Sequence, residues 1–151
     1  MLFIINNPFL YVSQTMDNLI RFGIAINQEL LTKFDKHLSN KGYTNRSEAI
    51  RDLIRESLIQ EEWKTNEYII GVISFVYNHH IPKLTEKLVD LQHHSGEIVS
   101  SMHIHLNESN CLEIIVVRGK SKQVEKLAGK MFALKGVKHG KLIRTTTARK
   151  V

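Results

Sequence analysis

Two hydrophobic periodicities divide the chain and predict two structural units. Residues 20–26 (IRFGIAI) alternate apolar and other side chains with a period of two, which indicates a strand with one buried face. Apolar residues then recur at helical spacing in two segments. The first runs from Asn27, as the N-cap, to about residue 41 and ends at Gly42, and the second follows Asn45 to about residue 63. From about residue 65 strand-like patterns dominate.

One strand and two helices cannot bury their own apolar surface, because an unpaired strand leaves a row of open backbone groups. The strand must therefore pair with a copy of itself. Residues 18–64 resemble the ribbon-helix-helix DNA-binding domains, most closely over residues 42–51 (GYTNRSEAIR). In that family a two-stranded ribbon enters the major groove, and the start of the second helix holds a phosphate. The resemblance implies a DNA-binding surface made by Arg21, Gly23, Ala25, Arg46 and Ser47.

The second unit, residues 65–151, has the predicted order βαββαβ. Strands are expected over residues 67–77, 98–106, 111–117 and 137–146, and helices over residues 82–94 and from Ser121, as the N-cap, to a stop at Gly136. This order is typical of a ferredoxin-like fold of the ACT type, in which two helices cover one face of a four-stranded antiparallel sheet. The predicted class is therefore α+β, and residues 1–17 form an N-terminal extension without the features of a secretory signal.

Composition and cysteine content indicate the cellular compartment, and the charge distribution indicates a possible contact surface. A content of 42% hydrophobic and 24% charged residues is ordinary for a soluble globular protein, and no apolar run reaches the roughly 18 residues of a membrane span. The single cysteine cannot form an internal disulfide, which favours the reducing cytoplasm. The net charge of +6 comes from residues 118–150, which hold eleven basic residues and one acidic residue. Such a run is a solvated face or a surface that contacts phosphate.

Candidate metal ligands are concentrated in residues 102–113 (MHIHLNESNCLE). His103 and His105 project from the same face of a strand, and Ile104 is expected to point the other way, towards a core. The polar residues that follow can turn the chain, so that Cys111 begins the partner strand beside His105. Two imidazoles and a thiolate can therefore converge as metal ligands.

The fourth ligand is left open by this reasoning. Six of the eight histidines fall between His79 and His105, which gives four candidates: His79, His80, His93 and His94. The same pattern is also compatible with simple packing of a half-buried histidine pair and a buried free cysteine.

The run Gln92-His93, followed by His-x-His and then Cys-Leu-Glu, completes a second resemblance. Together with the two units, it resembles the nickel-responsive transcriptional regulators of bacteria, from Asn18 to about Thr146. The resemblance implies a homotetramer that binds palindromic double-stranded operator DNA, mainly as a repressor, when Ni(2+) is bound. It also implies a His3Cys metal site at a subunit interface and further residues that orient the imidazoles. The ligands carried over are His103, His105 and Cys111 of one subunit and His93 of a neighbour, with Gln92 and Glu113 beside them.

Three imidazoles and one thiolate in a plane suit Ni(II) or Cu(II), so the choice of nickel rests on the resemblance. The chain departs from the family in two places. The connection from His93 to His103 is one residue shorter than expected, which makes His94 an alternative ligand. Gly23 and Ala25 replace hydroxyl residues that usually face the groove, which leaves Arg21 as the strong direct reader of bases.

Three other classes of protein compete with this interpretation. The first is a ribbon-helix-helix regulator whose ACT unit senses copper, zinc or a small molecule such as an amino acid. The second is a plain antitoxin-like DNA-binding protein, which would have no use for the histidines and the cysteine. The third is an enzyme with Cys111 as nucleophile, which would need a base and an oxyanion site that the sequence does not indicate. We therefore expect no catalytic activity.

Overall fold

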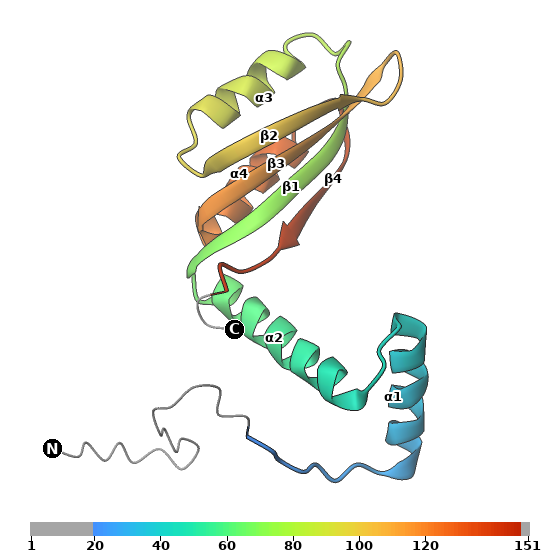
Figure 1. The fold of residues 1–151 in the computed structure, drawn as a ribbon. Helices are drawn as coiled ribbons and strands as arrows, with labels where there is room; N and C mark the ends of the chain where they lie inside the picture. Colours follow the sequence, from blue (N-terminus) through green and yellow to red (C-terminus); the bar gives the residue numbers. More distant parts are fainter. Residues whose placement is uncertain (1–19, 149–151) are drawn as a thin grey trace, which may run out of the picture.

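The computed structural model describes residues 20–148, so the predicted N-terminal extension lies outside the described residues. Two helices stand apart from a sheet that is packed with two further helices (Figure 1). The elements in chain order are α1 (Gln28–Lys41), α2 (Arg46–Lys64), β1 (Tyr68–Asn78), α3 (Leu84–His93), β2 (Ile98–His105), β3 (Asn110–Lys120), α4 (Ser121–Phe132) and β4 (Val137–Arg144). Within residues 20–148, no helix has the length and apolar character needed to cross a membrane.

The two N-terminal helices begin and end at the predicted residues. The side chain of Asn27 accepts a hydrogen bond from the Leu30 amide at 2.8 Å, and Asn45 accepts one from the Glu48 amide at the same distance. Gly42 ends α1 with φ of +79°, a left-handed conformation that glycine adopts without the steric cost of a Cβ. The predicted caps are therefore confirmed, since each satisfies backbone groups that a helix end leaves open.

Residues 20–27 carry no regular secondary structure within the single chain, although the sequence predicts a strand there. Their large apolar side chains are exposed, with Ile20, Phe22 and Ile24 each at least 66% accessible. The predicted pairing with a second copy stays a prediction, because the structure holds one chain. The exposed apolar face is what an unpaired ribbon strand would present.

The C-terminal unit has the predicted βαββαβ order, with an antiparallel sheet in the order β2-β3-β1-β4. Alternate residues of β1 and β3 are buried. On that face Ile73, Ile115 and Val117 pack with Leu88 of α3 and Met131 of α4 in one core, all at most 1% exposed. The two helices therefore cover one face of the sheet, as expected of a ferredoxin-like fold.

The boundaries of α4 differ from the prediction. Ser121 is not the N-cap but the first residue of the helix, and its hydroxyl donates instead to the Trp63 carbonyl at 2.6 Å. The helix ends at Phe132, before Gly136, which has φ of +107°. A Cβ at Gly136 would lie 2.7 Å from the Leu84 side chain, so the glycine serves the close turn into β4 rather than a helix stop.

The other face of the sheet is not covered within the described chain. Met102, Ile104 and Ile143 are 58%, 36% and 50% exposed. The expectation that Ile104 points towards a core is therefore wrong for the single chain, because the core lies on the face that carries His103 and His105. Ile104 does lie on the opposite face from His103 and His105, as strand alternation predicts, but the positions of α3 and α4 decide which face is buried.

Candidate metal centre

Three neighbouring strands bring the candidate ligands to one end of the sheet. Cys111, near the start of the central strand β3, pairs with His105 on one side and with Tyr77 of β1 on the other. Directly paired residues project from the same face, so His105 and Cys111 share the face that α3 and α4 cover. His79 follows the end of β1, and its amide donates to the Ser109 carbonyl at 3.2 Å.

The Cys111 sulfur lies between two imidazoles. Its Sγ is 3.1 Å from Nδ1 of His79 and 3.3 Å from Nδ1 of His105, and ligand atoms of all three residues lie within 4.8 Å of one another. Zinc-type bond lengths of about 2.0–2.3 Å place two ligand atoms of one ion roughly 3–4.5 Å apart. The three side chains are therefore spaced to hold one metal ion, and their nitrogen and sulfur donors suit a late transition metal such as nickel.

Before a metal binds, the surroundings favour the neutral forms of His79 and Cys111. Burial raises the pKa of the Cys111 thiol, and the negative charge of Glu113 raises it further. Burial lowers the pKa of His79, and the neighbouring imidazoles of His80, His105 and His103 lower it further. A neutral imidazole is ready to donate its lone pair, whereas the thiol must lose its proton when it binds an ion.

His103 lies beside this cluster but is not part of it. Its Nδ1 is 3.4 Å from the Tyr77 hydroxyl, and its ring centroid is 4.9 Å from that of His105. The residue opposite His103 in the sheet is Glu113, which is 7% exposed and accepts a short hydrogen bond from the Gln92 side chain. The two residues predicted to orient the imidazoles thus contact each other beside the predicted ligands.

The remaining histidines lie outside the cluster. His93 is the last residue of α3 and is exposed, and His94 Nδ1 lies 2.9 Å from the Asp90 carbonyl oxygen. His80 Nε2 lies 2.9 Å from the Glu108 carbonyl oxygen. Because the predicted fourth ligand belongs to a neighbouring subunit, the roles of His93 and His94 stay predictions.

His79 is one of the four histidines that the sequence offers as a fourth metal ligand, and the structure places it beside the Cys111 sulfur. Its signal in the sequence is its place directly after a strand that ends in Tyr77-Asn78. Only the pairing of β1 with β3 shows that this strand end lies beside Cys111.

The predicted DNA-binding residues are all on the surface. Arg21, Gly23 and Ala25 lie in the exposed stretch before α1. Arg46 and Ser47 begin α2, and the Arg46 guanidinium forms two 2.7 Å hydrogen bonds to the Asp35 carboxylate of α1. These bonds hold the pKa of Asp35 below its usual value. The pair links α1 to the start of α2, and the predicted phosphate contact there stays a prediction.

Comparison with known proteins identifies the family to which this chain is similar. The family model described as the NikR C-terminal nickel-binding domain matches residues 70–145. A protein of Pyrococcus furiosus that carries the name "Putative nickel-responsive regulator" is 52% identical over 88% of this chain and 98% of its own length. The corresponding regulator of Geotalea uraniireducens is 50% identical over 90% of this chain and 99% of its own length, and that of Pyrococcus abyssi is 50% identical over 89% and 99%.

The chain belongs to the family of nickel-responsive regulators. The family model spans the end of β1 and the turn that follows it, all of β2 and all of β3, which together carry His79, His105 and Cys111. The C-terminal unit is therefore a nickel-binding domain, and nickel is its cofactor. The sequence-based recognition of the family is confirmed. The names of the relatives describe regulators, in agreement with the expectation that the protein is not an enzyme.

Proposed function

We propose that this protein is a nickel-responsive transcriptional regulator, mainly a repressor, that binds palindromic operator DNA when nickel is bound. The observation that carries the proposal is the approach of His105 to the Cys111 sulfur, with His103 beside His105, inside the matched nickel-binding domain. The protein would act in the cytoplasm, where operator DNA and a reduced cysteine are both available.

The proposed nickel ligands are His103, His105 and Cys111 of one subunit and His93 of a neighbour. Nickel would supply a cation that draws ligands of two subunits together. Two of the three ligands from one subunit already lie within 3.3 Å of each other, and His103 is next to them at the Tyr77 hydroxyl. His103 would exchange its contact with Tyr77 for the metal, while Gln92 and Glu113 hold the strand face beside it.

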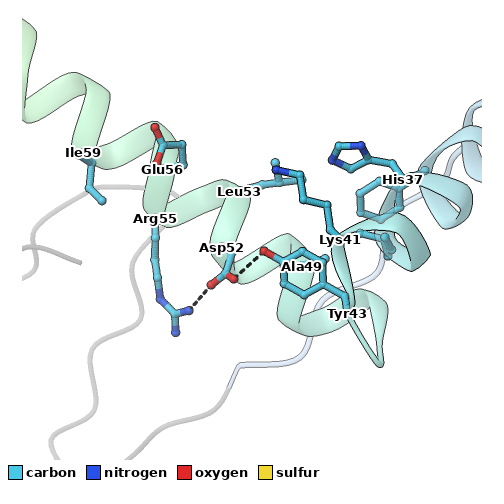
Figure 2. A pocket seen from close by; sticks show the side chains of 11 residues that line it. His37, Lys41, Tyr43, Ala49, Asp52, Leu53, Arg55, Glu56 and Ile59 are labelled. Carbon is cyan, nitrogen blue, oxygen red and sulfur yellow. Dashed lines mark hydrogen bonds and ion pairs between the residues drawn. The ribbon is translucent and has the colours of Figure 1, made fainter. Parts of the chain in front are cut away.

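The assembly we propose is a homotetramer of two DNA-binding dimers. The N-terminal helices support it, because an open cavity of about 460 Å³ between α1 and α2 is lined by both apolar and polar side chains (Figure 2). Leu53 lines this cavity and is 56% exposed. A second copy that pairs along residues 20–26 would bring the exposed apolar residues of both chains together, as a ribbon-helix-helix dimer requires.

Metal and DNA binding would be linked. If nickel favours an arrangement in which both ribbons reach two half-sites, nickel raises DNA affinity, and DNA raises nickel affinity by the same factor. Coupling of about 1–3 kcal/mol, or roughly 5- to 150-fold, is typical of one effector.

The test is equilibrium binding of the purified protein to its own promoter fragment, with stoichiometric nickel and with chelator, at one fixed salt concentration. We expect tight binding only with nickel, and loss of this response in Cys111→Ala but not in the exposed control Ser57→Ala. Equal binding with nickel and with chelator would contradict the proposal.

A second candidate is a response to zinc or copper. The observation that favours it is His79, since a compact set of two imidazoles and one thiolate also suits zinc. Repeating the promoter titration with each metal separates the two candidates: a stronger DNA response to zinc or copper than to nickel would favour the second.

A further inference from the structure

Most of the positive charge of this protein lies outside the proposed DNA-binding unit. Residues 18–64 hold eight basic and seven acidic side chains, whereas residues 118–150 hold eleven basic side chains and one acidic side chain. The affinity of a protein for duplex DNA comes in large part from lysine and arginine side chains that neutralise phosphates. A DNA-binding unit with almost no net charge therefore supplies little of that attraction by itself.

Ion pairs within the N-terminal helices reduce this attraction further. Four basic side chains of α1 and α2 are paired with carboxylates of the same two helices: Lys33 with Glu29, Arg46 with Asp35, Arg51 with Glu48 and Arg55 with Asp52. A basic side chain that already has a carboxylate partner must exchange or share that partner when it contacts a phosphate. Positive charge that is free to meet DNA must therefore come largely from the C-terminal unit.

Three lysines lie along the exposed side of α4, and we call them the lysine stripe. Lys122, Lys126 and Lys130 are spaced four residues apart, so they follow one another on one side of the helix. All three residues are exposed. The other side of α4 packs into the core through four buried residues: Val124, Leu127, Ala128 and Met131. This packing fixes the direction of the helix, so the lysine stripe faces solvent.

No carboxylate neutralises the lysine stripe within the described chain. The ion pairs among residues 20–148 include none of its three side chains. Glu125, the only acidic residue of α4, is paired with Arg144 of β4 at 2.9 Å. Like charges four residues apart on a helix repel each other, and the first turn of α4 has no acidic residue to complement the helix dipole. The stripe therefore destabilises the free helix, and a bound polyanion would offset this cost.

Two acidic residues share a cleft with part of the stripe. Lys126 and Lys130 line an open cleft of about 240 Å³ between α3 and α4, and Asp90 and Glu97 line the same cleft. The Asp90 carboxylate lies 3.0 Å from Nδ1 of His94 and is not paired with a lysine. A polyanion would therefore approach the stripe from the solvent side of α4, away from these carboxylates.

The length of the stripe suits the phosphate backbone of DNA. Lys122 and Lys130 are eight residues apart in the sequence, which corresponds to about 12 Å along the helix axis. Phosphates of one DNA strand follow one another at about 3.4 Å along the duplex axis, so this length spans about three to four of them. A lysine ammonium group binds a phosphate as a point charge and reads no base sequence.

We propose that the lysine stripe of α4 is a sequence-independent phosphate-binding surface that contacts duplex DNA both with and without nickel. The choice of DNA rests on the proposed function, which brings a duplex to this protein, and the charge of the stripe rests on the contacts above. The three lysines are not part of the metal cluster. The stripe therefore sets the general affinity for DNA, and the nickel site sets how that affinity changes.

The test measures binding of the full-length protein to a duplex of unrelated sequence, in chelator, over a series of salt concentrations. Each phosphate contact contributes about 0.9 to the slope of log affinity against log salt. The triple variant Lys122→Gln/Lys126→Gln/Lys130→Gln should therefore lower the slope by about 2.7 for each stripe that contacts DNA. Over an approximately fourfold rise in salt, the variant should lose about 40-fold less affinity than the wild type does.

Matched variants separate charge from other effects. Lys122→Arg/Lys126→Arg/Lys130→Arg keeps the charge and should keep the wild-type slope. Lys126→Gln alone should lower the slope by about 0.9, whereas Lys87→Gln, an exposed change on α3, should leave it unchanged. Nickel affinity should stay within about 2-fold of the wild type in every variant, because these lysines lie outside the metal cluster.

An unchanged slope in the glutamine variant would overturn the inference, and so would a wild type that does not bind the unrelated duplex at low salt. An equal fall of the slope in the arginine variant would also contradict it. Tighter binding of the wild type to vesicles of phosphatidylserine and phosphatidylcholine than to DNA, lost in the glutamine variant, would assign the stripe to membranes instead. If the wild type binds its promoter equally with nickel and with chelator, the proposed function fails, and the salt slope still tests the stripe.

Discussion

Leu53→Ala tests whether the N-terminal helices pair with a second copy. Leu53 is 56% exposed in the single chain and lines the open cavity between α1 and α2. The substitution removes three carbon groups, each of which contributes about 0.8 kcal/mol when buried. Scaled by the exposed fraction of 56%, the loss is about 1.3 kcal/mol per chain and about 2.7 kcal/mol per symmetric dimer. Pairing should therefore weaken about 100-fold.

Hydrogen exchange of residues 20–26 measures this pairing directly. Within the described chain these amides belong to no helix or strand, so protection in the wild type would come from a second copy. We expect protected amides in the wild type and exchange that is about 100-fold faster in Leu53→Ala, because the free energy of local opening falls by the amount lost. Val89→Ala, on the 44% exposed Val89 of α3, is the control and should leave these amides unchanged. Fast exchange in the wild type would refute the ribbon.

Two further predictions concern the metal centre and the packing of the sheet. Because burial and Glu113 raise the pKa of Cys111, the thiol is protonated near neutral pH, and apparent nickel affinity should rise about tenfold per pH unit until the thiol pKa is reached. Glu113→Gln removes the negative charge, lowers that pKa and should move the whole profile to lower pH in nickel titrations; an unmoved profile would contradict this cause. A Cβ at Gly140 would overlap the Phe132 ring, so Gly140→Ala should lower the free energy of unfolding by about 1–3 kcal/mol in urea titrations. Gly129→Ala, in open space on α4, should instead raise it by about 0.5–1 kcal/mol.

Local signals in the sequence predicted the elements well. The caps at Asn27 and Asn45 and the glycine stop at Gly42 depend on contacts within a few residues, and all three are present. The order of strands and helices in the second unit also followed from periodicity alone. Such features could be predicted because their physical causes lie within one turn or one strand.

Features that depend on distant residues were predicted less well. Ser121 has the chemistry of an N-cap, but a buried hydrogen bond to Trp63, 58 residues away, determines its place. His79 could not be chosen among four histidines, because its approach to Cys111 depends on the register of β1 against β3. Whether the Ile104 side chain is buried depends on which face of the sheet α3 and α4 cover. In each case tertiary packing decided between options that were equal in the local sequence.

The single chain leaves two groups of apolar side chains uncovered. One lies along residues 20–26 and at Leu53 beside the α1–α2 cavity, and the other on the sheet face that carries Met102, Ile104 and Ile143. The two surfaces differ from each other. Each would therefore pair with the same surface of another copy, which is an isologous contact. A chain with two different isologous contacts has two two-fold axes. When these axes intersect at right angles, the assembly closes at four copies, and when they do not intersect, it grows without limit. The proposed tetramer is the smallest closed assembly that uses both contacts, and it would place ligands of one subunit beside those of another.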